Sequence, residues 1–137
     1  MNGMTRRESR ELAFILLFEK SFTEESVTDI LHAAEEAREV QHDAFALSLA
    51  EGAVSHIEEI DALISASSHK WNTSRLSRVS LSIMRLAVYE MEWETDIPVS
   101  VSINEAVELA KRYGGEADAS FVNGVLGGIS RRENDHE

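Results

Sequence analysis

The chain has 137 residues, the length of one domain and enough to bury a hydrophobic core without disulfides or a structural metal. It contains no cysteine, which excludes disulfides, thiolate metal sites and cysteine nucleophiles and fits a reducing compartment. There are 13 lysine and arginine residues against 25 acidic residues, so the formal net charge is −12, a balance that argues against a generic nucleic-acid binder.

The longest uninterrupted apolar segment covers residues 12–18. A membrane-spanning helix needs about 20 such residues, and no basic and apolar leader precedes this segment. We therefore expect a cytoplasmic protein that does not contact a membrane.

Helix-permissive sequence predicts an all-α fold. Pro98 is the only proline, and no glycine interrupts residues 4–51. Thr5 and Glu8 have the spacing of a capping box, which predicts a first helix over residues 5–20. Thr23 is the expected N-cap of a second helix that ends near residue 38.

Apolar residues at helical spacing predict one long third helix over residues 43–65, and the polar residues 65–70 then mark a junction between two helical halves. We expect the next helix to begin near Asn72 or Thr73, to continue to about residue 91, and to end before Pro98.

The remaining sequence predicts two more helices. Ser102 and Glu105 form a second possible capping box, and Gly114 and Gly115 end the helix that it opens. The last helix is expected over residues 118–131. The prediction is thus a single domain with one helical half at 5–66, a second at 71–131, and a polar tail at 132–137.

The negative charge is concentrated in one part of the chain. Residues 21–69 carry one basic and 11 acidic residues, a net charge of −10. Residues 1–20 have a net charge of +1 and residues 70–91 a net charge of +3. An acidic flank and two short basic segments are therefore expected on different parts of the surface.

The first basic segment contains Arg6, Arg7 and Arg10, at the helix N-terminus where the helix dipole disfavours cations. Their spacing suggests that the three guanidinium groups share one side of the helix. A polyanion site and an ordinary solvated helix start both explain this pattern. The second basic segment contains Arg75, Arg78 and Arg85. Ion pairing to the acidic helices explains this segment as well as a functional surface does.

Lys111 and Arg112 lie at a helix C-terminus, where the dipole favours cations, so structure alone accounts for them. Phe121 opens the last helix and is either a core residue, which is favoured, or an exposed ring for base stacking.

Motifs for catalysis are missing from the sequence. It contains no glycine-rich phosphate loop, no nucleophile elbow and no zinc-protease motif. Two Glu-x-x-His pairs, at residues 39–42 and 133–136, lie between helices and in the tail, where a helical-bundle metal site is not formed. We expect no enzyme, no metal and no cofactor.

The motifs taken together resemble the NusB family of bacterial transcription antitermination factors. The resemblance covers about residues 5–130. It rests on RRESRELA at 6–13, LFE at 17–19, MRLAVYEM at 84–91, DIP at 96–98, VSINEAVELAK at 101–111 and FVNGVL at 121–126.

This resemblance implies about seven helices in two three-helix-like halves. It also implies an adaptor that binds the boxA element of ribosomal RNA transcripts together with ribosomal protein NusE, so that RNA polymerase reads through terminators. The alternative, from a different class, is a helical protein–protein interaction module or homodimer with no direct RNA role.

The resemblance also assigns residues to two surfaces. The RNA-binding residues are expected to be Arg6, Arg7, Arg10, Ser120, Phe121 and Asn123. The residues facing the protein partner are expected to be Phe18, Arg75, Arg78 and Ser80. At three of these positions relatives have other residues: many have a lysine in place of Ser120, some have an acidic residue in place of Ser80, and a tyrosine often stands in place of Phe18.

Overall fold

The computed structural model describes residues 5–37, 39–68 and 76–135, and the side chains of all of these except 133–135. These residues form seven α-helices and no strand, which confirms the predicted all-α fold. The helices are α1 (Arg6–Lys20), α2 (Val27–Glu36), α3 (Ala44–Ser55), α4 (Ile57–Ser67), α5 (Arg78–Trp93), α6 (Val99–Tyr113) and α7 (Glu116–Asp135). None of them is long and apolar enough to cross a membrane.

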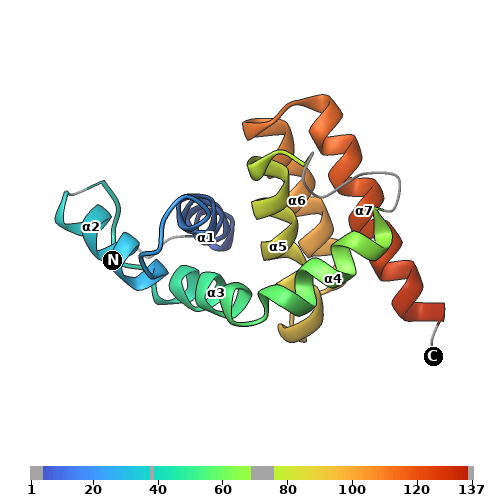
Figure 1. The fold of residues 1–137 in the computed structure, drawn as a ribbon, viewed down its shortest axis with the longest axis horizontal. Coiled ribbons are helices and arrows are strands. Elements are labelled where there is room, and N and C mark those ends of the chain that lie inside the picture. Colours follow the sequence, from blue (N-terminus) through green and yellow to red (C-terminus); the bar gives the residue numbers. More distant parts are fainter. Residues whose placement is uncertain (1–4, 38, 69–75, 136–137) are drawn as a thin grey trace.

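Helix α1 occupies the middle of the arrangement, between α2 and α3 on one side and α5 on the other (Figure 1). Helices α5, α6 and α7 pack side by side, with α6 contacting both of its neighbours. Helix α4 leaves the first group and packs against α5 and α7. All seven helices contribute to one continuous hydrophobic core.

The second half of α1 supplies much of this core, as its sequence predicts. Leu12, Ala13, Phe14, Leu16 and Leu17 are all buried. A helix that is apolar on every side is stable only where other helices surround it. The placement of α1 between α3 and α5 meets that requirement.

The expectation of one long helix over residues 43–65 is wrong, because the backbone breaks at His56. The imidazole ring of His56 stacks on the indole of Trp93, with 4.1 Å between the ring centroids. The break turns α4 away from the axis of α3 and toward α5 and α7. Periodicity alone did not reveal it, since residues on both sides keep the same apolar spacing.

Two predicted helix starts are also wrong. Helix α2 is capped by Ser26, whose hydroxyl accepts from the Asp29 N–H, while Thr23 accepts from Glu25 in the preceding turn. Helix α6 starts at Val99, so Ser102 lies inside the helix instead of capping it. The proposed starts at Asn72 or Thr73 lie outside the described residues, and α5 is capped by Ser77.

The ends of the last two helices follow the sequence more closely. Gly114 is the C-cap of α6, as predicted, and Gly115 has a φ of +113°, a left-handed conformation that favours glycine. Helix α7 then begins at Glu116, two residues before the predicted start, and extends beyond residue 131. A tight glycine turn therefore joins the end of α6 to the start of α7.

A close approach between α3 and α5 makes Gly52 important for stability. A Cβ atom at this position would lie 2.2 Å from Cζ of the Tyr89 ring. That ring cannot move freely, because it stacks near Trp93 and its hydroxyl donates to Glu94. We expect Gly52→Ala to lower the free energy of unfolding by about 1–3 kcal/mol, measured by urea denaturation.

The matched control is Gly124→Ala in α7, where an added Cβ meets no atom within 4 Å. There, alanine is expected to stabilise the helix by about 0.5–1 kcal/mol. Equal effects of the two substitutions would show that the contact between Gly52 and Tyr89 is not tight.

Candidate nucleic-acid interface

The first turn of α1 is fixed by the predicted capping box. The Thr5 hydroxyl accepts from the Glu8 N–H at 3.1 Å, and the Thr5 N–H donates to the Glu8 carboxylate at 2.8 Å. These reciprocal bonds satisfy two donors at the helix start, and the Glu8 carboxylate offsets part of the unfavourable charge of the neighbouring arginines. The arginines therefore extend from a well-ordered helix terminus.

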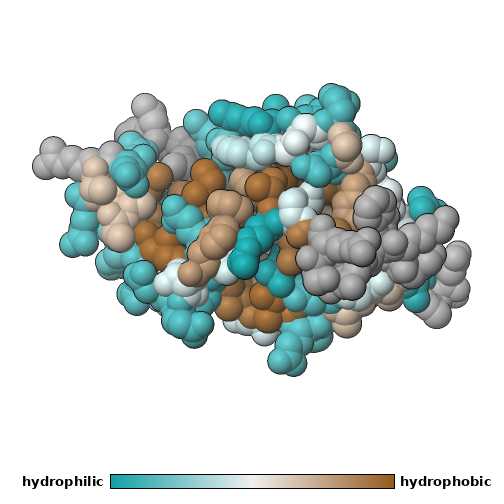
Figure 2. Space-filling view, turned by 45° about the horizontal axis from the view of Figure 1, so that its top comes forward, coloured by the Kyte–Doolittle hydropathy of each residue, from teal (hydrophilic) through white to brown (hydrophobic). Residues whose placement is uncertain are grey.

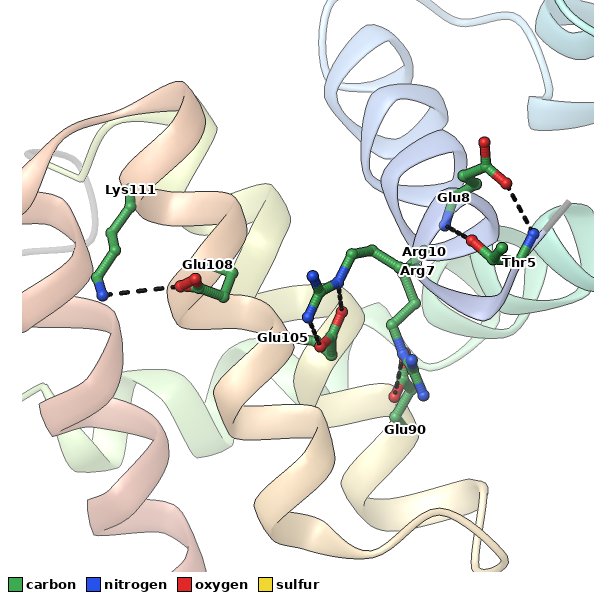
Figure 3. Close-up of polar contacts among 8 residues, drawn as sticks. All are labelled: Thr5, Arg7, Glu8, Arg10, Glu90, Glu105, Glu108 and Lys111. Atoms are coloured by element: carbon green, nitrogen blue, oxygen red, sulfur yellow. Dashed lines mark hydrogen bonds and ion pairs between the residues drawn. The ribbon is translucent and has the colours of Figure 1, made fainter.

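The three arginines of this turn have different environments, so the expectation that they share one side is wrong. The Arg6 guanidinium lies 3.8 Å from the ring centroid of Phe45 in α3. Arg7 reaches across to Glu105 of α6, whereas Arg10 points to Glu90 of α5 (Figure 3). Arg6 and Arg7 are exposed and Arg10 is buried.

Arg7 binds Glu105 through two parallel hydrogen bonds. Its Nε donates at 3.0 Å and its Nη2 at 2.8 Å to the two carboxylate oxygens. The hydrogen bond and the positive charge of Arg7 hold the pKa of Glu105 below its usual range, although partial burial acts against them. The Arg7 side chain remains 72% exposed, so the rest of its guanidinium faces solvent.

Arg10, in contrast, belongs to a buried hydrogen-bond network. Its Nε lies 2.9 and 3.1 Å from the two carboxylate oxygens of Glu90, and the Arg10 and Glu90 side chains are only 9% and 1% exposed. The Ser102 hydroxyl donates a further hydrogen bond of 2.8 Å to Glu90. This network joins α1, α5 and α6, and it explains why Ser102 is buried inside α6.

An open groove of about 370 Å³ lies between α1 and α6. Arg7 and Glu11 line it from α1, and Glu105, Leu109 and Arg112 line it from α6. A space-filling view shows hydrophobic surface in the middle of the molecule, bordered and crossed by hydrophilic side chains (Figure 2). Most of the lining is charged: the cations are Arg7, Arg10, Lys111 and Arg112, the carboxylates are Glu11, Glu105 and Glu108, and Leu109 is apolar. Cations along a groove are a feature of single-stranded nucleic-acid sites.

The residues expected at the start of α7 lie at its surface side. Ser120 and Asn123 are exposed, and Phe121 is half-buried and packs against the core. The sequence left open whether Phe121 is a core residue or an exposed ring for base stacking. The structure places it between these two cases.

A second group of candidate residues gathers where α1 ends. Phe18 is half-buried and contacts Phe22, a residue that is 62% exposed. The Arg78 guanidinium lies 4.5 Å from the Phe22 ring centroid and donates to the Ser21 carbonyl at 2.6 Å. We call Phe18, Phe22 and Arg78 the aromatic patch.

Ser80, another expected partner residue, is not part of this surface. Ser80 is buried, and its hydroxyl has no hydrogen-bond partner among the residues that the structure describes, so the expectation of a surface contact through Ser80 is wrong. Arg75 lies outside the described residues.

Sequence reasoning missed Phe22, because a single phenylalanine after a helix carries no periodic signal. It also missed the structural role of Glu90. The one available signal was that a charged residue stands in an otherwise apolar stretch of α5.

No group of three or more potential metal ligands occurs among the described residues. Of the first Glu-x-x-His pair, His42 contacts Glu35 at 2.7 Å. The second pair lies beyond the side chains that the structure describes.

Comparison with known proteins decides the family. The NusB family model matches residues 7–131, which include every helix from the first turn of α1 to most of α7. The chain belongs to the NusB family.

Two NusB proteins from other bacteria align with nearly the whole chain. The transcription antitermination protein NusB of Clostridium acetobutylicum is 44% identical over 128 residues, 92% of this chain and 95% of the relative. The NusB of Trichlorobacter lovleyi is 42% identical over 134 residues, 96% of this chain and 94% of the relative.

Solved structures of the family have the same fold. NusB from T. maritima superposes with a TM-score of 0.84 at 36% identity, covering 95% of this chain and 93% of that one. In a crystal structure of antitermination factors NusB and NusE in complex with dsRNA, the matching chain has a TM-score of 0.81 at 29% identity and covers 93% of this chain and 96% of its own. These likenesses confirm the predicted resemblance and fold.

The Arg10 network gives a prediction for stability. Arg10→Ala leaves the Glu90 carboxylate buried without its cation, so the free energy of unfolding is expected to fall by about 3–5 kcal/mol in a denaturant titration. Arg7→Ala is the matched control, because its ion pair with Glu105 is exposed and its loss is expected to cost far less.

A second variant separates the charge effect from lost packing. Arg10→Met combined with Glu90→Met removes both charges and is expected to recover most of the stability. If Arg10→Ala and Arg7→Ala were equally mild, the buried network would not be important for folding.

Proposed function

We propose that this NusB-family protein is an RNA-binding transcription antitermination factor that binds boxA RNA together with the ribosomal protein NusE. The main support is the placement of exposed arginines beside an open groove in a chain similar to a NusB that has been crystallised with NusE and dsRNA. No catalytic step is part of the proposal.

The proposed RNA surface begins at the N-terminus of α1. Arg6 and Arg7 are exposed there, and a guanidinium that is held through one edge still has N–H donors on its other edges for phosphate oxygens. Ser120, Phe121 and Asn123 at the start of α7 complete this surface. RNA sequence is usually read on single-stranded segments, for which a groove and a partly exposed ring are suitable.

Arg10 enters the proposal as a positioning residue. Its Nε binds Glu90 and its side chain is only 9% exposed, so it sets where α1 lies relative to α5 and α6. The exposed arginines on the same turn depend on that placement.

The aromatic patch is the proposed NusE-binding surface. Exposed aromatic and arginine side chains are the residue types that contribute most to protein interfaces. Ser80, buried below the surface of α5, is not assigned a contact.

Joint binding follows from the charge. With a net charge of −12, the whole molecule repels RNA, and a few phosphate contacts have to overcome this repulsion. A basic partner would offset the field and add RNA-binding surface.

The test of RNA binding uses a fluorescently labelled boxA oligonucleotide, with and without NusE, at several salt concentrations. We expect tighter binding by the mixture than by this protein alone. Arg6→Gln with Arg7→Gln is expected to reduce the slope of log affinity against log salt by about 1.4, or 0.7 for each lost phosphate contact. An unchanged slope would remove α1 from the RNA site.

NusE binding is tested separately, by calorimetry without RNA. Phe22→Ala is expected to weaken NusE binding roughly 5- to 30-fold, the effect of losing 1–2 kcal/mol at an aromatic interface residue. The control is Val101→Ala at the start of α6, which also truncates an exposed apolar side chain. Self-association by this protein with no affinity for NusE or RNA would instead favour the interaction-module alternative.

A further inference from the structure

The groove between α1 and α6 has a second cationic side, which neither the sequence pattern nor the assignments above include. It is formed by Lys111 and Arg112 in the last turn of α6, and both residues line the groove opposite Arg7. We propose that RNA follows this groove and that Lys111 and Arg112 bind its phosphates. This inference rests on the proposed RNA-binding function and extends its site.

The geometry of Arg112 supports this role. Its side chain is 69% exposed, Nη1 lies 2.7 Å from the Glu11 carboxylate, and Cζ lies 5.7 Å from the ring centroid of Tyr113. The other edges of the guanidinium remain for phosphate oxygens. Lys111 is about half-exposed and lies 3.7 Å from Glu108, a long contact for an ion pair.

The carboxylates in the groove hold these cations in place without removing their charge. Glu11 accepts from Arg112 and also from the Tyr113 hydroxyl, and Glu105 takes one edge of Arg7. Arg7 and Arg112 are therefore each held by a carboxylate from the opposite helix, while Lys111 contacts Glu108 on its own helix. A phosphate that approaches from solvent meets guanidinium edges whose orientation is already restricted, which reduces the entropy lost on binding.

The position of the second side also connects the two parts of the proposed RNA surface. Lys111 and Arg112 stand directly before the glycine turn at Gly114 and Gly115, and Ser120 and Phe121 follow in the first turns of α7. A strand that lies along the groove from Arg7 thus reaches the end of α6 and then the start of α7. Figure 3 shows Arg7 meeting Glu105, while Glu108 and Lys111 pair with each other farther along α6.

Favourable interaction with the helix dipole explains why cations occur at the end of α6. It does not explain why both of them line the groove with Arg7, because a helix end can present cations in other directions. Their shared groove is the observation that indicates a ligand with several negative charges.

The experiment measures the affinity of the complex with NusE for labelled boxA RNA as a function of salt. Lys111→Gln with Arg112→Gln is expected to lower the salt slope by about 1.4, the loss of two phosphate contacts. The charge-matched control is Arg131→Gln with Arg132→Gln near the other end of α7, about 20 Å or more along the helix from its start, which is expected to leave the slope unchanged.

The outcomes separate this inference from the proposed function. Lys111→Gln with Arg112→Gln could leave the salt slope unchanged while Arg6→Gln with Arg7→Gln reduces it. This result would overturn only the proposed role of Lys111 and Arg112. Absence of RNA binding by the native complex would overturn the function itself. Equal slope changes in the groove variant and its charge-matched control would show a net-charge effect and would also overturn the inference. Thermal unfolding of each variant confirms that it is folded.

Discussion

The buried ion pair of Arg10 and Glu90 is the contact on which the rest of the site depends. Taking two charges out of water is costly, and the cost is offset only when the geometry is good and the remaining lone pairs are satisfied. Both oxygens of Glu90 lie within hydrogen-bond distance of Arg10, and Ser102 donates to one of them. One carboxylate thereby fixes the relative positions of α1, α5 and α6.

That constraint separates the roles of arginines that look equivalent in sequence. Once Arg10 is committed to the interior, the turn of α1 before it is held at the edge of the groove, where Arg7 meets Glu105. Toward the end of the same helix, the rings of Phe14 and Phe18, and that of Phe22 in the turn that follows, pass from the core to the surface. The candidate RNA and partner surfaces therefore both depend on the packing of one helix.

The sequence predicted the elements that depend on local signals. The capping box at Thr5 and the glycines after Tyr113 act within a few residues, and the structure confirms both. The break at His56 was not predicted, because the apolar spacing continues across it and the ring that stacks on His56, that of Trp93, lies far along the chain. Ser102 failed as a predicted cap for the same reason: its hydroxyl binds a carboxylate on another helix.

The partners of the charged residues could not be predicted from local sequence either. The arginines of residues 6–10 could be located from sequence, but their partners could not, since Glu90 and Glu105 are about 80 and 98 positions away. Most of the negative charge lies in residues 21–69, while each exposed cation of the groove is held by a carboxylate from the opposite helix or the same turn. The carboxylates weaken the positive electrostatic potential of the groove while they orient its cations. Strong RNA binding therefore requires additional positive charge. A basic partner bound at the proposed aromatic patch would supply it, and joint binding would then be a consequence of how this acidic molecule places its few cations.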